Sequence, residues 1–142
     1  MESGRFDTLQ TSVSIADQEA IELTLPLARE RGLGVIAKRP LANVAWRYAR
    51  KPAEPYYQDY WERLRALDYV FLRGAARDGV KIALRFTLGE AGVDTAIVGT
   101  TKPDRWRENA ALLGDGRLPD AQREAIRARW KAVAARDWVG QI

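Results

Sequence analysis

The sequence contains no cysteine and no histidine, and it has a single methionine. Without cysteine the chain can form neither a disulfide nor a thiolate ligand, so we expect a reducing compartment, the cytoplasm. Without histidine it lacks the commonest metal ligand and the commonest general base. The sequence therefore argues against a zinc enzyme, and we expect no metal site.

Long apolar runs are also missing. No run approaches the ~20 residues that a membrane helix requires, and residues 1–11 have neither the basic start nor the apolar stretch of a signal peptide. The composition is that of a globular protein, with 46% hydrophobic and 30% charged residues. The net charge is +4, but basic residues alternate with acids, as at 28–31 and 105–108. We therefore expect neither membrane nor nucleic-acid binding.

Strands and helices are predicted to alternate along the chain. Gly32 is expected to end the first helix and Asp17 to cap its start. Short β-prone or uninterrupted apolar runs predict strands at 6–13, 33–37 and 93–98. Apolar residues at helical spacing predict helices at 18–31, 60–73, 80–88, 104–113 and 119–135.

The alternation predicts an α/β fold with a parallel sheet. The two more apolar strands, 33–37 and 93–98, are expected to be buried, as strands of parallel sheets are. Three strands are too few for a complete sheet of this kind, and open edges invite pairing. The fold is therefore expected to be incomplete on its own.

Three segments together resemble the aldo-keto reductases: FDTLQTSVS at 6–14, GVIAKRPLA at 34–42 and AIVGTTKPDRWREN at 96–109. The third is the most specific, and the resemblance extends over nearly the whole chain. It implies the C-terminal part of a (β/α)8 TIM barrel, with 1–142 as one partial NADP-dependent oxidoreductase domain. It also implies NADP(H) as cofactor and, only in a complete barrel, a small carbonyl substrate.

The third segment has the features of a phosphate site. Gly99, Thr100 and Thr101 lie between a predicted strand and a helix N-terminus. Backbone N–H groups and the helix dipole favour an anion at such a position. Lys102 and Arg105 add positive charge within one turn, and arginine can bind phosphate through two parallel hydrogen bonds.

The resemblance assigns this phosphate to the cofactor. Matching residues in the family bind the 2′-phosphate and stack on adenine, so Arg105 implies NADP(H) rather than NAD(H). Glu108 and Asn109 stand at the positions that contact adenine in the family. The alternative is an ordinary helix with charged residues on its surface.

Two residues are expected at the nicotinamide end. Gln10 should lie near the carboxyl end of its strand, where barrel active sites are built, and its family counterpart binds the carboxamide. The alternative is a buried glutamine bonded to backbone. Lys38 stands where many family members have an aromatic residue that stacks on nicotinamide. Lysine cannot stack in this way, which leaves a solvated or paired lysine and a Schiff-base nucleophile as alternatives.

The loop after the second strand resembles the family loop that passes the pyrophosphate. Its matching residues are Arg39, Pro40, Leu41 and Asn43. Trp46, in the same loop, is expected either in the core or in the wall of a substrate pocket, whereas Trp106 is expected in the core.

The family's catalytic Asp, Tyr, Lys and His occupy the first half of the barrel, so the resemblance implies that no catalytic residue lies in this chain. Three hypotheses follow: a fragment of a reductase, a half-barrel that assembles with itself or with a separate first half, and a non-catalytic nucleotide-binding module. Exposed apolar strand faces predict self-association. We expect no carbonyl reduction by the chain alone.

Overall fold

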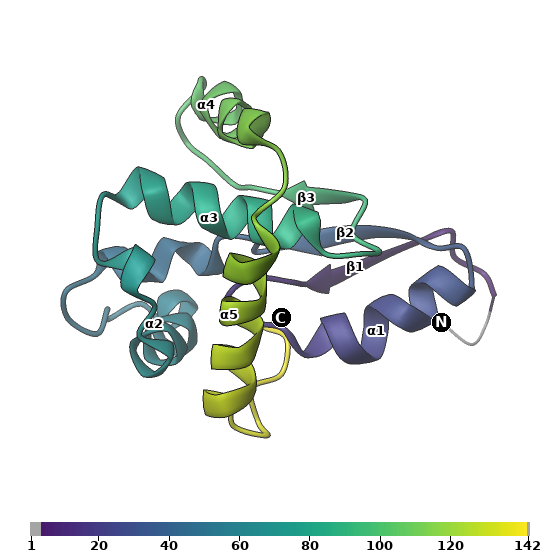
Figure 1. Ribbon diagram of the computed structural model, residues 1–142, viewed down its shortest axis with the longest axis horizontal. Helices are drawn as coiled ribbons and strands as arrows, with labels where there is room; N and C mark the ends of the chain where they lie inside the picture. Colours follow the sequence, from purple (N-terminus) through teal and green to yellow (C-terminus); the bar gives the residue numbers. More distant parts are fainter. Residues whose placement is uncertain (1–3, 142) are drawn as a thin grey trace.

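A computed structural model describes residues 4–141. A parallel three-stranded sheet lies at its centre, with β1 (Thr8–Ser12), β2 (Gly34–Lys38) and β3 (Thr95–Ile97) in the order β1-β2-β3. The carboxyl ends of the strands point toward the α2 side of the molecule (Figure 1). The alternation of parallel strands with helices predicted from the sequence is therefore confirmed.

Helices and short 3₁₀ turns connect the strands and cover one face of the sheet. The α-helices are α1 (Glu19–Glu30), α2 (Pro55–Leu67), α3 (Ala76–Gly89), α4 (Arg105–Leu112) and α5 (Asp120–Val133). The 3₁₀ turns are η1 (Ala42–Arg47), η2 (Val70–Leu72) and η3 (Leu113–Asp115). In Figure 1, α4 stands apart at one margin and α5 crosses in front of the sheet.

The two ends of α1 differ in how well the sequence predicted them. Gly32 adopts φ 64° just after the helix, and the Leu33 N–H donates to the Ala28 carbonyl at 2.9 Å, as in a glycine-terminated helix. Asp17, however, does not cap the start. Gln18 occupies the N-cap position, and its side chain makes no capping hydrogen bond to the helix. The Asp17 backbone instead closes a tight turn with Ser14, and its carboxylate is buried.

Two further helices have boundaries that differ from the prediction. The helix predicted at 60–73 begins at Pro55, whose fixed φ suits a first turn, and ends at Asp68, which has φ 46°. Residues beyond it form the separate turn η2. The helix predicted at 80–88 begins at Ala76, so Asp78 lies inside its first turn.

One face of the sheet is covered. Val35 and Ala37 of β2 are 1% and 0% exposed and pack with Leu25 and Ala28 of α1. A second, larger core joins the carboxyl-end loops to α2, α3 and α5. It is built around Ile15, Tyr60, Leu67, Phe86 and Ile126.

The opposite face is largely open, so the prediction that 93–98 is a buried strand was wrong. Thr95 and Ile97 of β3 are exposed, Ile97 by 51%, because only the Ala96 side of this strand meets a helix. Trp106 was also predicted wrongly, since it is 60% exposed on α4. None of the helices within 4–141 is long and apolar enough to cross a membrane.

Candidate functional site

The open face carries the two residues predicted for the nicotinamide end. Gln10 pairs in register with Ile36, and Lys38 pairs with both Ser12 and Ile97. Because alternate residues of a strand share a face, Gln10 and Lys38 are diagonal neighbours on the open face. Gln10 is exposed, so the alternative of a buried glutamine is excluded.

The loop after β2 has an unusual backbone. Arg39, Ala42, Asn43 and Val44 have φ between 43° and 54°. Residues other than glycine rarely adopt this left-handed conformation, and for a β-branched residue such as valine it is strained. Strained backbone of this kind concentrates at binding and active sites. The loop that resembles the pyrophosphate loop is therefore also the most strained segment of the described chain.

Side chains of this loop divide between the core and the surface. Pro40 and Leu41 are buried, and the Thr87 hydroxyl donates to the Pro40 carbonyl at 3.3 Å. The Asn43 side chain donates to the Tyr56 carbonyl at 2.9 Å. Only backbone atoms of Pro40 and Leu41 could therefore reach a ligand, whereas Arg39 is a partly exposed residue.

The segment between β3 and α4 has the donors that a phosphate requires. Within residues 4–141, the backbone N–H groups of Thr100, Thr101 and Asp104 have no hydrogen-bond acceptor. The Lys102 N–H donates to the Thr100 hydroxyl at 3.1 Å, which shapes the turn. Gly99 has open space where a side chain would stand. These residues fit an anionic group at the N-terminus of α4.

Two predicted residues of α4 are engaged with each other. Arg105 Nη1 lies 2.8 Å from Glu108 Oε2, and both side chains are partly exposed. Exposed pairs of this kind contribute little to stability, so a phosphate can compete for the guanidinium. Asn109 is 9% exposed where α4 packs on α3.

Trp46 belongs to the core. It packs against the larger core cluster, with its indole close to Gly79. A Cβ at Gly79 would lie 3.3 Å from Trp46 Nε1 and 3.0 Å from Leu72 Cδ2, so a larger residue there would require these side chains to shift. Of the two alternatives for Trp46, packing against the core is observed, although the side chain also lines a small cavity of about 80 Å³ beside Trp61 and Leu64.

A buried polar cluster that the sequence did not predict lies beside the carboxyl end of β1. Asp17, Tyr60 and Arg63 are 1%, 1% and 3% exposed. The Tyr60 hydroxyl donates to Asp17 Oδ2 at 3.3 Å, and Arg63 Nη1 is 3.8 Å from the same oxygen. Burial raises the pKa of Asp17 to about 6, against the opposing effect of the Arg63 charge.

The C-terminal residues close over this cluster. Arg63 Nη2 donates to the Val139 carbonyl at 2.9 Å, and the Ser12 hydroxyl donates to the Gln141 carbonyl at 3.2 Å. Ser12 is thereby 2% exposed, although it lies on the open face. The cluster escaped prediction because Asp17-Gln18-Glu19 has the pattern of a helix start, and Arg63 is distant in sequence.

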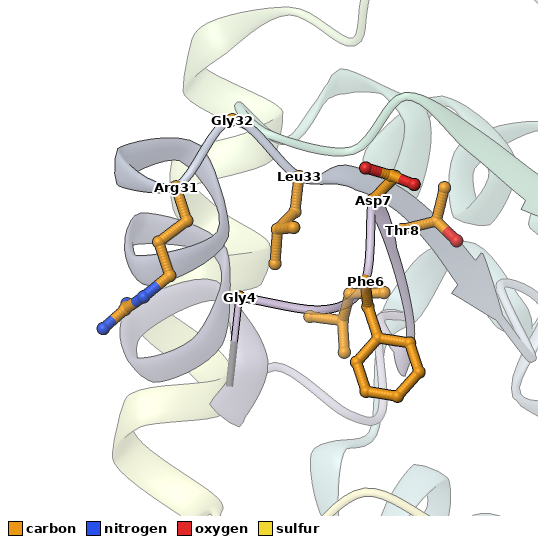
Figure 2. Close-up of a pocket in the computed structure, with 8 residues that line it drawn as sticks. Gly4, Phe6, Asp7, Thr8, Arg31, Gly32 and Leu33 are labelled. Atoms are coloured by element: carbon orange, nitrogen blue, oxygen red, sulfur yellow. The ribbon is translucent and has the colours of Figure 1, made fainter. Parts of the chain in front are cut away.

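A cavity of about 400 Å³ lies at the other end of the sheet. Gly4, Phe6, Thr8, Arg31 and Leu33 are among its lining residues. Figure 2 shows the Arg31 guanidinium directed away from the other labelled side chains, so charged groups do not converge there. Residues 4–141 also contain no group of three acidic side chains that could hold a metal. We therefore place the candidate site at the carboxyl end.

Comparison with known proteins decides the family. The family model described as "Aldo/keto reductase family" matches residues 2–131. The chain belongs to the aldo/keto reductase family. This is a family of nicotinamide-nucleotide-dependent oxidoreductases. The resemblance read from three short segments is thus confirmed over most of the chain.

Solved structures confirm the fold as part of a barrel. The aldo-keto reductase AKR11C1 from Bacillus halodurans is similar in its holo form, with 22% identity and a TM-score of 0.72. Its apo form gives 22% identity and a TM-score of 0.70. The matches cover 94% and 93% of this chain but 46% of the other, so the chain spans about half its length. Among curated proteins, none matches the chain.

Proposed function

We propose that this chain supplies the NADP(H)-binding portion of an aldo-keto reductase barrel and does not reduce carbonyl groups by itself. The observation that carries the proposal is the turn at 99–104, with unpartnered backbone N–H groups beside Lys102 and Arg105. Family membership makes a nicotinamide nucleotide the expected ligand of such a turn.

Each end of the nucleotide has candidate partners. The turn and Arg105 would hold the 2′-phosphate, and Glu108 and Asn109 would adjoin the adenine. Arg39 and the strained loop would pass the pyrophosphate, with Gln10 at the carboxamide. Bound NADPH supplies the hydride that converts a carbonyl to an alcohol. The fit of these residues is chemical, since N–H donors and cationic side chains are the groups that bind phosphate oxygens.

The proposed lack of turnover follows from the catalytic residues that the family uses. In the family a tyrosine protonates the carbonyl oxygen with help from a lysine, an aspartate and usually a histidine, and this chain has no histidine. Lys38 lies on the open face of the sheet, and we assign it a binding role. NADPH oxidation with a simple aldehyde that is abolished by Lys38→Ala would contradict this assignment.

Nucleotide binding tests the proposal without reference to catalysis. NADP+ should change the tryptophan fluorescence and raise the melting temperature, and Arg105→Ala should weaken binding about tenfold, since one charge-assisted contact is lost. Arg107→Ala is the matched control, because Arg107 lies on the same helix and pairs with Asp104 at 2.8 Å. Equal binding of NAD+ and NADP+ would remove the 2′-phosphate assignment.

A second candidate function is a non-catalytic nucleotide-binding half-barrel that associates with itself or with a separate partner. The open sheet face favours it, because Ile97 is 51% exposed and both β1 and β3 have an unpaired edge. If the chain is such a half-barrel, it binds NADP+ as an oligomer. If it needs a partner for its first half, carbonyl reduction appears only when the two are combined.

A further inference from the structure

One stretch of the chain is basic without any acidic residue. Between Glu30 and Glu54 there is no Asp or Glu, whereas elsewhere acids and bases alternate. The cations of this stretch are Arg31, Lys38, Arg39, Arg47, Arg50 and Lys51. All except Arg31 lie at or beyond the carboxyl end of β2, on the side of the candidate site. This concentration of one sign attracts anions.

Two arginines of this stretch form a continuous series of ring contacts with Tyr48 and with Tyr56 and Tyr57, which follow the stretch. We call it the Arg39–Arg47 ladder. The Arg39 guanidinium carbon lies 5.3 Å from the Tyr56 ring centroid, and the Tyr56 and Tyr57 rings are 5.1 Å apart. Tyr57 and Tyr48 are also 5.1 Å apart, and the Arg47 guanidinium lies 4.7 Å from the Tyr48 ring. The ladder therefore runs from the strained loop to the surface.

The tyrosines of the ladder are held by their backbones. The Asn43 side chain donates to the Tyr56 carbonyl, and the Trp61 indole N–H donates to the Tyr48 carbonyl, both at 2.9 Å. Trp61 itself packs against the main core. Because these bonds hold the backbones of Tyr56 and Tyr48 in place without a ligand, binding at the ladder requires little backbone reorganisation.

Arg47 is the exposed end of the ladder. Its guanidinium lies over two rings, 4.7 Å from Tyr48 and 5.5 Å from Tyr57, and Nη2 donates to the Tyr48 hydroxyl at 2.6 Å. Arg47 is exposed, and an arginine guanidinium can hold two oxygens of one anion. Lys51 differs, because it is paired with Glu62.

We propose that the Arg47 end of the ladder binds an oxyanion group, a carboxylate or a phosphate monoester, of a small ligand other than the nucleotide. Arg47 contributes the charge, the hydroxyls of Tyr48 and Tyr57 add donors, and the rings cover the adjoining part of the ligand. The residues that resemble the pyrophosphate loop lie at the opposite end, at Arg39. We identify this ligand as an anionic carbonyl substrate, and that identification rests on the proposed function. The anion site itself does not rest on it.

Titration of the full chain with inorganic phosphate and with succinate, at constant ionic strength, tests the site. Tryptophan fluorescence serves as the readout, since Trp61 is bonded to Tyr48. We expect saturable binding that Arg47→Gln weakens about tenfold or more, because a charge-assisted, paired contact is lost. Tighter phosphate binding identifies a phosphate monoester, and tighter succinate binding identifies a carboxylate.

Two further variants make the test specific. Arg47→Lys keeps the charge but loses the planar fork, so most of the affinity should be lost with it. Arg77→Gln, on the exposed start of α3, removes the same charge elsewhere and should leave binding unchanged. Equal affinity in the wild type and Arg47→Gln, or an equal loss in Arg77→Gln, would overturn the proposal.

The result is separable from nucleotide binding. Arg47→Gln should leave the affinity for NADP+ unchanged, and Arg105→Ala should leave the affinity for phosphate or succinate at Arg47 unchanged. A chain that binds no NADP+ but shows Arg47-dependent anion binding would refute the proposed function while supporting the anion site. NADP+ binding without Arg47-dependent anion binding would do the reverse.

Discussion

The two faces of the three-stranded sheet have very different surroundings. On one face, Val35 and Ala37 are buried against α1. On the other, Gln10 and Ile97 of the same sheet are exposed. Stability is therefore concentrated on the helix side, while the open side carries the candidate ligand-binding groups. A half-barrel separates two properties that a closed barrel combines: a packed wall and an interior that needs further strands to cover it.

The largest expected effect contrasts one residue from each face. Leu25→Ala removes most of a side chain that is only 1% exposed, and it should lower the free energy of unfolding by about 2–5 kcal/mol. Ile97→Ala should lower it by less than about 1 kcal/mol, because half of that side chain is already in water. Urea denaturation at low protein concentration measures both. Equal losses would show that the open face is covered in solution.

The next effect concerns the part of the open face near Ser12, which the C-terminal residues cover. Asp17 beneath them has a pKa raised from 3.8 to about 6. A carboxyl group whose pKa is higher in the folded state stabilises that state when it is protonated. This stabilisation is complete below the pKa of the unfolded state and is lost as the pH rises through the pKa of the folded state. The free energy of unfolding should therefore fall by at most about 3 kcal/mol between pH 4 and pH 7 from this group.

Comparison with Asp17→Asn isolates that contribution, since the other carboxyl groups titrate alike in both proteins. The variant should have a flatter stability profile between pH 4 and pH 7, and Trp138, which lies over Arg63, should report the change in fluorescence. Asp59→Asn, on the exposed side of α2, is the control and should keep the wild-type profile. The same slope in Asp17→Asn and wild type would refute the assignment.

A smaller effect is expected on association. If the open face pairs with another chain, Ile97→Lys should weaken self-association about tenfold, because it places a charge in an apolar contact. Sedimentation equilibrium over a range of concentrations measures this. A wild-type chain that stays monomeric at all concentrations would show that the open face does not pair with itself.

The sequence predicted well what depends on local patterns. Glycine after α1 and apolar runs at β2 indicated where elements begin and end, because these depend on neighbouring residues. The prediction from sequence failed where contacts between residues distant in the sequence decide the structure. Asp17 has the pattern of a helix cap but faces Arg63 across 46 positions of sequence, and Trp106 has helical spacing but is 60% exposed.

The candidate site was only partly accessible to the same reasoning. The turn at 99–104 could be found because its glycine, threonines and cations are consecutive. The Arg39–Arg47 ladder could not be found in this way. Its rings come from two segments of the chain that the left-handed loop at 39–44 brings together. No spacing rule predicts four left-handed residues other than glycine within the six positions 39–44.

Nucleotide binding and turnover measured in one sample test the central claim most directly. The full chain is titrated with NADPH, and the absorbance of the nucleotide is then followed after addition of a simple aldehyde. We predict saturable NADPH binding that depends on Arg105 and not on Arg107, with no oxidation of the nucleotide. Absence of binding, or oxidation that requires the chain and the aldehyde, would contradict the account.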